Sequence, residues 1–84
     1  MSGPPELAVR LREVMGQVLD LQPGEIGPEL SAASSSAWTS LNHLMLVSQL
    51  ENEFGVVFSN EEIRKLTSYS AILETLARRL DSVA

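Results

Sequence analysis

Ser40 is the residue with the clearest chemical potential, because it opens a strongly patterned helical segment, Ser40 to Phe54. The first turn of a helix presents unpaired backbone amides and the positive end of the helix dipole, and both favour a phosphate. A serine hydroxyl in this place is a plausible attachment point for a phosphodiester. The rest of the chain is therefore considered for how it positions Ser40.

His43 follows three residues after Ser40, so the two side chains lie near one another on a helix and suggest a hydrolytic pair. A catalytic triad also needs an orienting carboxylate and an oxyanion hole, and no Gly-x-Ser-x-Gly motif surrounds Ser40. The helical period places His43 towards the core, as a packed or pocket-edge residue. It has no partner at a metal-ligand spacing, so we predict no catalytic residue and no metal site.

Four carboxylates near the middle of the chain, Glu51, Glu53, Glu61 and Glu62, could suggest acid–base chemistry or a cation site. Nothing in their spacing places two of them in a water-excluded pocket. Charges on short helices mostly form a solvated face, which is the simpler interpretation.

Length and composition restrict the class of protein. The 84 residues suffice for one small domain, which we expect over residues 6–84 behind a flexible lead of residues 1–5. The formal charge of −5 argues against nucleic acid as a partner and favours basic protein surfaces. The chain has no cysteine, no signal-peptide pattern and no apolar run that could span a bilayer. We expect a cytoplasmic monomer that binds no membrane.

Apolar residues at helical spacing predict a first amphipathic helix from about Leu7 to Leu19, which Pro23-Gly24 stops. A long connection over residues 21–39 follows, rich in Gly, Pro and Ser. Its expected anchors to the core are Ile26, Leu30 and Trp38, and Trp38 is expected to pack rather than to contact a partner.

The second helix carries two apolar sides. Its core side is expected to hold Leu46, Val47, Leu50 and Phe54. The opposite side carries Leu41, Leu44, Met45 and Ser48, which either lie half-buried under the long loop or form an exposed docking patch.

The remaining sequence predicts two more helices. Gly55 ends the second helix, and Val56-Val57-Phe58 is expected to be an extended link that places Phe58 in the core. Ser59 and Glu62 have the spacing of a capping box, which predicts a short helix from about Asn60 to Leu66. Ser68 can cap a fourth helix, whose apolar residues include Ile72, Leu73, Leu76, Ala77, Leu80 and Val83. The fold class is thus all-α: a small four-helix bundle with a long first loop and a short third helix.

Three motifs in this order resemble the acyl carrier and peptidyl carrier protein family, over roughly Leu7 to Leu80. They are Trp38-Thr39-Ser40-Leu41-Asn42-His43-Leu44, Leu50-Glu51-Asn52-Glu53-Phe54-Gly55-Val56, and Ser59-Asn60-Glu61-Glu62-Ile63. The family carries a phosphopantetheine arm on a serine that opens its second helix, and Ser40 is the matching position. Thr39 departs from the aspartate usual in fatty acid and polyketide carriers.

The resemblance implies a stand-alone, non-catalytic carrier with covalent 4'-phosphopantetheine on Ser40. A phosphopantetheinyl transferase would attach the arm, an adenylating ligase or acyltransferase would load it as a thioester, and downstream synthases or transferases would use the cargo. The implied docking residues are Leu41, Leu44, Met45 and Ser48, with Glu51, Glu61 and Glu62 steering basic partners, and the implied pocket edge is Trp38, Thr39 and His43. The motif around Ser40 is more similar to carriers of specialised polyketide or nonribosomal peptide metabolism than to the carrier of housekeeping fatty acid synthesis.

Two other readings of the residues stay open. In a helical adaptor, Ser40 would only be an N-cap, and the side with Leu41, Leu44 and Met45 would bind a partner helix. A small esterase using Ser40 and His43 is the third and weakest hypothesis.

Overall fold

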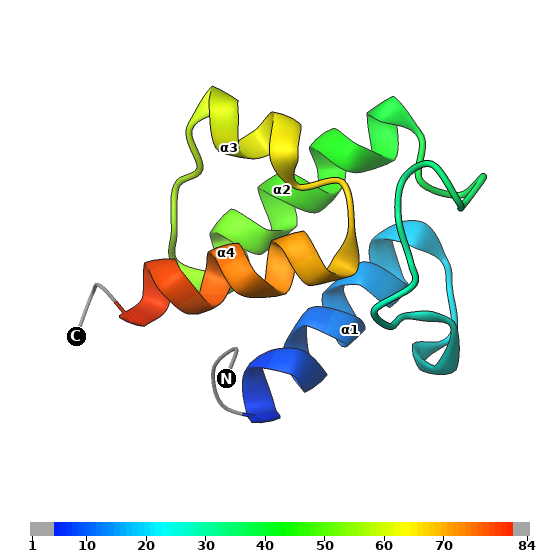
Figure 1. The fold of residues 1–84 in the computed structure, drawn as a ribbon, viewed down its shortest axis with the longest axis horizontal. Helices are drawn as coiled ribbons and strands as arrows, with labels where there is room; N and C mark the ends of the chain where they lie inside the picture. Colours follow the sequence, from blue (N-terminus) through cyan, green and yellow to red (C-terminus); the bar gives the residue numbers. More distant parts are fainter. Residues whose placement is uncertain (1–4, 82–84) are drawn as a thin grey trace.

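The computed structural model describes residues 5–81 and contains four α-helices and one short 3-10 turn. In chain order these are α1 (Pro5–Leu19), η1 (Pro23–Glu25), α2 (Ser40–Phe54), α3 (Asn60–Lys65) and α4 (Tyr69–Asp81). Figure 1 shows α1, α2 and α4 around a common core, with the short α3 across one side and the long α1–α2 connection at one end. The described residues form no strand, only an isolated bridge between Ser31 and Ser68. The predicted all-α fold with a short third helix is confirmed.

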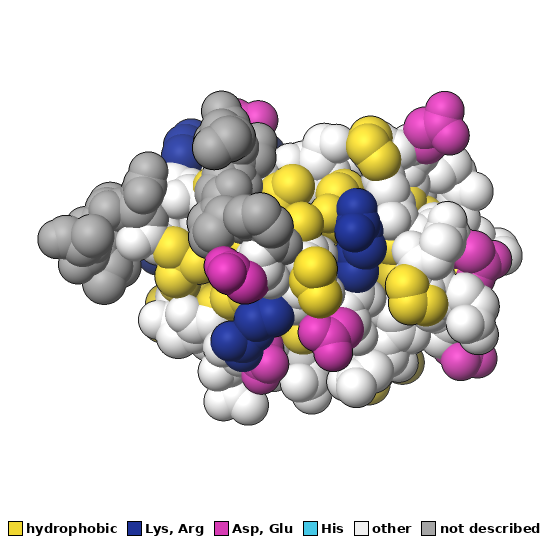
Figure 2. Space-filling model, turned by 90° about the horizontal axis from the view of Figure 1, so that it is seen from below, with side chains coloured by type: hydrophobic (Ala, Val, Ile, Leu, Met, Phe, Trp, Pro, Cys, Tyr) yellow, Lys and Arg dark blue, Asp and Glu magenta, His cyan; other side chains and the backbone are white. Residues whose placement is uncertain are grey.

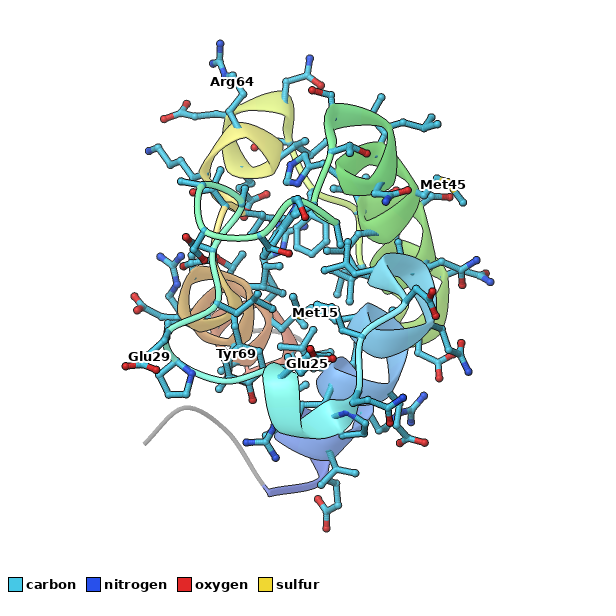
Figure 3. The ribbon with its side chains drawn as sticks, turned by 90° about the vertical axis from the view of Figure 1, so that its right-hand side faces the viewer. Met15, Glu25, Glu29, Met45, Arg64 and Tyr69 are labelled. Atoms are coloured by element: carbon cyan, nitrogen blue, oxygen red, sulfur yellow. The ribbon has the colours of Figure 1, made fainter. Side chains whose placement is uncertain are left out.

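The core comes from one apolar face of each long helix, as the helical periods predicted. Leu11, Met15, Leu46, Leu50 and Ile72 are almost completely buried. Figure 3 shows Met15 between the helices. Of the residues expected in the core of α2, Phe54 alone is half-buried, and the Arg10 guanidinium lies over its ring, 5.4 Å from the centroid. The predicted lead of residues 1–5 lies outside the described residues except for Pro5, as does Val83.

The first helix ends at Leu19, as the apolar spacing predicted, but Asp20 and not Pro23-Gly24 stops it. Asp20 takes a left-handed conformation with φ 57°, and the Leu21 N–H donates to the Gly16 carbonyl at 3.0 Å. Asp is one of the few non-glycine residues that tolerates this backbone region. The helix therefore ends at Leu19, and Pro23 begins the separate turn η1.

The long connection over residues 21–39 is pinned to the rest of the domain at several points. Ile26, Leu30 and Trp38 are all buried, as predicted. Two backbone hydrogen bonds also join the connection to the α3–α4 link and to the start of α4: the Ala32 N–H donates to the Thr67 carbonyl at 2.8 Å, and the Tyr69 N–H donates to the Leu30 carbonyl at 3.0 Å. The segment that leads into α2 is thus hydrogen-bonded to residues just before and at the start of α4.

Capping residues set the remaining helix boundaries. Gly55 closes α2 in the left-handed region at φ 66°, as predicted. Ser59 caps α3, with Glu62 returning a bond to the Ser59 N–H at 2.9 Å, so the predicted capping box is present. The Ser68 hydroxyl accepts from the Ala71 N–H at the start of α4. These helix boundaries could be predicted from the sequence because each cap depends only on neighbouring residues.

Candidate functional site: a serine at the start of the second helix

Thr39, and not Ser40, is the N-cap of α2. Thr39 has extended backbone angles, and its hydroxyl accepts a hydrogen bond from the Asn42 N–H at 3.1 Å. The idea that Ser40 serves only as an N-cap is therefore wrong. An N-cap residue has non-helical backbone angles, and its side chain accepts a hydrogen bond from an amide two or three residues further on. Here Thr39 meets both conditions.

Ser40 is the first residue inside the helix, and its side chain is exposed. Its hydroxyl makes no hydrogen bond with any residue of the range 5–81. The amides of the first turn have no acceptor within their own helix, apart from the one that Thr39 satisfies. A group bonded to the Ser40 oxygen would thus project into solvent next to the positive end of the α2 dipole, which suits a phosphodiester.

Thr39 fills the capping position at which fatty acid and polyketide carriers usually have an aspartate. Thr and Asp both cap helices by accepting a hydrogen bond from the same first-turn amide. The observed bond from Asn42 shows that Thr39 fills this structural role. What Thr39 lacks is the negative charge of an aspartate beside the serine.

His43 links three segments of the site. Its Nδ1 accepts a hydrogen bond from the Trp38 indole N–H at 3.0 Å, and its Nε2 lies 2.9 Å from the Ile63 carbonyl. Because Nδ1 is an acceptor, the ring proton is on Nε2 and is donated to Ile63. Both ring nitrogens are occupied, so His43 has no lone pair left for the Ser40 hydroxyl. This geometry argues against the esterase reading and agrees with a packed, pocket-edge histidine.

A pocket of about 410 Å³ lies directly beside Ser40, between the start of α2, the long connection and α3. Trp38, Thr39 and His43, the three residues predicted at a pocket edge, all line it. The other walls of the pocket were not predicted, because they come from segments distant along the chain: Ala32, Ile63, Arg64 and Thr67. Two of these wall residues, Ala32 and Thr67, are joined directly by a backbone hydrogen bond.

The side of α2 facing away from the core is an exposed apolar surface. Leu41 is 68% exposed, Leu44 61% and Met45 50%, and Ser48 is exposed too. Figure 3 shows Met45 on the outer side of α2, opposite to the core residue Met15. Of the two alternatives for this side of the helix, burial under the long loop is therefore wrong. Leu41, Leu44 and Met45 are called the apolar patch below.

The three acidic residues predicted to steer partners are each engaged within the domain. Glu51 accepts the Phe58 N–H at 2.8 Å, and Glu61 pairs with Lys65 at 3.2 Å. Glu62 accepts the Ser59 N–H and pairs with Arg79 at 3.1 Å. The Ser59 N–H bond, aided by Arg79, holds the pKa of Glu62 below its ordinary value despite partial burial. Glu51 thus has a structural role that the sequence patterns did not predict, and Glu62 adds an ion pair with Arg79 to its predicted role in the capping box.

A second pocket of about 410 Å³ lies between α3 and α4, and Glu61, Glu62, Glu74 and Arg78 are among its residues. It lies away from Ser40 and has a mixed-charge lining. Over residues 5–81, no group of three or more His, Asp or Glu side chains is placed to hold a metal ion. None of the helices in this range combines the length and apolar character that a membrane span needs.

The four helices, with an exposed serine opening the second of them, are the arrangement expected of a small helical carrier domain. Over 75 residues the chain is 28% identical to a protein of Thermosynechococcus vestitus named acyl carrier protein, a match covering 89% of this chain and 93% of that protein. No family model matches the chain. The similarity runs over nearly all of both proteins, so the resemblance to acyl carrier proteins is confirmed, and it supports the role of a non-catalytic carrier.

Proposed function

We propose that this protein carries acyl or aminoacyl intermediates on a 4'-phosphopantetheine arm attached to Ser40. The observation that supports this most is the position of Ser40 at the first residue of α2, with an exposed hydroxyl that makes no hydrogen bond within residues 5–81, in a chain similar over 89% of its length to an acyl carrier protein. The arm, when bound, supplies a terminal thiol that holds cargo as a thioester. The chain has no cysteine of its own that could do so.

The attachment reaction needs only one group from this chain. The Ser40 oxygen attacks the β-phosphorus of coenzyme A, a new P–O bond forms, and the phosphoanhydride bond breaks to release 3',5'-adenosine bisphosphate. The hydroxyl proton passes to a base of the transferase, which also supplies magnesium. Since both ring nitrogens of His43 are occupied, the chain itself offers no base at this point.

The carrier's contribution is then positional. A long tether raises the effective concentration of the cargo at the active site of each partner. Partners bind and leave in turn, so the interfaces are small and weak. The expected partners are a phosphopantetheinyl transferase, a loading ligase or acyltransferase, and downstream synthases or transferases, in the cytoplasm.

The cargo is proposed to belong to specialised metabolism of the polyketide or nonribosomal peptide type. Support comes from the motif around Ser40, where Thr39 takes the capping role without the negative charge of an aspartate. The pocket beside Ser40 offers a mainly apolar wall, formed by Trp38, Leu44 and Ile63, against which part of the arm or cargo can lie.

The experiment is incubation with coenzyme A, magnesium and a broad-specificity phosphopantetheinyl transferase, followed by intact-mass measurement. The parent should gain the mass of one phosphopantetheine group, and Ser40→Ala should gain nothing. Ser70→Ala is a matched control, because Ser70 is also an exposed serine in the first turn of a helix, α4. It should be modified like the parent. An unmodified parent, with several transferases tried, would return the protein to the adaptor hypothesis.

A further inference from the structure

His43 joins two segments that lie far apart in the sequence through the two nitrogens of one ring. The Trp38 indole N–H donates to Nδ1 at 3.0 Å, and Nε2 donates to the Ile63 carbonyl at 2.9 Å. The Trp38 and His43 rings are also stacked, with their centroids 6.2 Å apart. Trp38 belongs to the long connection before α2, whereas Ile63 belongs to α3. This contact between three residues is called the His43 bridge below.

The His43 bridge is what ties the last part of the long connection to α3. Among the described residues, hydrogen bonds link residues 33–38 to α3 only through this bridge. The other hydrogen bonds of the segment run within the long connection or to α2. Trp38 and Ile63 both line the pocket beside Ser40, so the bridge joins two walls of that pocket. Without the bridge, one wall is no longer held to the other.

The bridge requires the neutral form of the imidazole. A neutral ring has one N–H and one acceptor nitrogen, and His43 uses both. Protonation adds an N–H at Nδ1, which then faces the Trp38 N–H, so that two donors oppose each other. The bond from Nε2 to the Ile63 carbonyl survives, because a charged donor strengthens it. Protonation thus releases Trp38 while His43 stays bonded to α3.

The long connection and α2 bring no charged group to the bridge. Between Glu29 and Glu51 the chain contains no Asp, Glu, Lys or Arg. The α3–α4 link contributes Thr67 to the pocket, and this side chain is uncharged. Figure 2 shows acidic and basic side chains close together on the face opposite α3, which lies away from the bridge. Among the described residues, no carboxylate lines the pocket at the bridge.

Helix α3 brings charges of both signs near the bridge, but its acids are engaged elsewhere. Glu61 and Glu62 each form an ion pair with a basic side chain. Arg64 lines the pocket, and Figure 3 shows it extending outwards from α3. A protonated His43 would therefore meet a like charge and no carboxylate in the pocket. Its charge is better solvated by water, which favours an open arrangement over the closed one.

We propose that the His43 bridge is a pH-sensitive switch, in which protonation of His43 releases Trp38 and opens the pocket beside Ser40. Histidine is the side chain that ordinarily changes its charge between about pH 5 and about pH 8. The closed arrangement needs the neutral ring, so it is fully present at the higher pH and is lost as the pH falls. The released indole N–H, buried and without an acceptor, moves towards water. The switch does not depend on whether Ser40 carries an arm.

The first test follows the accessibility of Trp38, the single tryptophan of the chain, by acrylamide quenching of its fluorescence. Trp38 is 5% exposed, so quenching is weak while the bridge is closed. From about pH 8 to about pH 5, the quenching constant of the parent should rise about threefold. In His43→Gln, whose side chain cannot be protonated, the constant should not change with pH. Circular dichroism at each pH checks that the helices stay folded.

Glu62→Gln is the matched control for acids that titrate near the bridge. It removes the carboxylate directly before Ile63 on α3 and leaves the three residues of the bridge in place. It should keep the pH-dependent rise of the parent. A rise that disappears in Glu62→Gln would assign the pH dependence to that carboxylate and overturn the inference.

The second test uses NMR of the parent alone, so it holds even if His43→Gln does not fold. The chain has one histidine and one tryptophan, and their ring signals are therefore assigned without ambiguity. The indole N–H resonance and the imidazole C–H resonances should follow one titration curve between about pH 8 and about pH 5.

Three results would overturn the inference: an imidazole that stays neutral down to about pH 5, an indole resonance that stays fixed while the imidazole titrates, or an equal rise of quenching in His43→Gln. Both tests use the protein without an arm. Their failure would leave the proposed attachment to Ser40 intact, and a failure of that attachment would leave the switch intact.

Discussion

Replacing His43 by leucine should destabilise the domain, because His43 holds the approach to Ser40 against α3. The Trp38 side chain is only 5% exposed, and its indole N–H donates to His43 Nδ1 at 3.0 Å. Without that acceptor the N–H is left buried and unpaired, which costs about 1–3 kcal/mol. The Ile63 carbonyl loses the His43 bond too, but it keeps a bond from the Leu66 N–H at 3.3 Å, so its loss adds little.

We therefore expect His43→Leu to lower the free energy of unfolding by about 2 kcal/mol, a substantial part of the ~5–10 kcal/mol typical of small domains. Urea unfolding followed by circular dichroism measures this value, and the melting temperature should fall by about 10 °C. Trp38→Phe provides the matched background, because it removes the N–H that His43 accepts. In that background the same His43→Leu change should cost clearly less, with a coupling of about 1 kcal/mol.

A loss below about 0.5 kcal/mol for His43→Leu would refute this reasoning, as would equal losses with Trp38 and with Phe at position 38. Either result would mean that the hydrogen bond between the two rings contributes nothing to stability.

Two further predictions concern caps. Thr39→Ala should lower the free energy of unfolding by about 1 kcal/mol, whereas Thr39→Asp should stay within about 0.5 kcal/mol of the parent and still be modified on Ser40, as urea unfolding and intact mass will show. For Glu62, the Ser59 N–H bond and Arg79 lower the pKa, so its stabilisation is fully present above the ordinary value near 4.5 and is lost as the pH falls through the lowered value. The stability gap between the parent and Glu62→Gln should thus be constant near neutral pH and shrink below about pH 4.5, and a gap that widens on acidification would contradict the assignment.

Local signals made most of the fold predictable. Capping by Ser59 and Ser68, the glycine that ends α2 and the core faces of α1 and α2 depend on residues close in sequence, and they are confirmed, with Phe54 half-buried as the exception on α2. The end of α1 at Leu19 agrees with the prediction, but the stop was assigned to Pro23-Gly24, because a left-handed Asp20 gives a weaker signal than a Pro-Gly pair.

The candidate site was predictable in part. From the sequence, the apolar patch could be either buried under the long loop or exposed, because the path of a long loop cannot be obtained from periodicity. The structure shows that it is exposed. The bond of Glu51 to the Phe58 N–H and the pairing of Glu62 with Arg79 were not predicted, because an acid that makes such a contact has the same spacing as one that faces solvent. The pocket walls Ala32 and Thr67 meet through a backbone hydrogen bond between distant segments, which no side-chain pattern encodes.

The central claim is that Ser40 carries the arm, and mapping the modified residue tests it most directly. Cleavage after glutamate should release residues 30–51 as one peptide, because Glu29 and Glu51 flank this stretch and no acid lies between them. After treatment with coenzyme A and transferase, fragment-ion spectra should place one phosphopantetheine on Ser40 and none on the other serines of the peptide. A group found on another serine, or an unmodified peptide, would contradict the account.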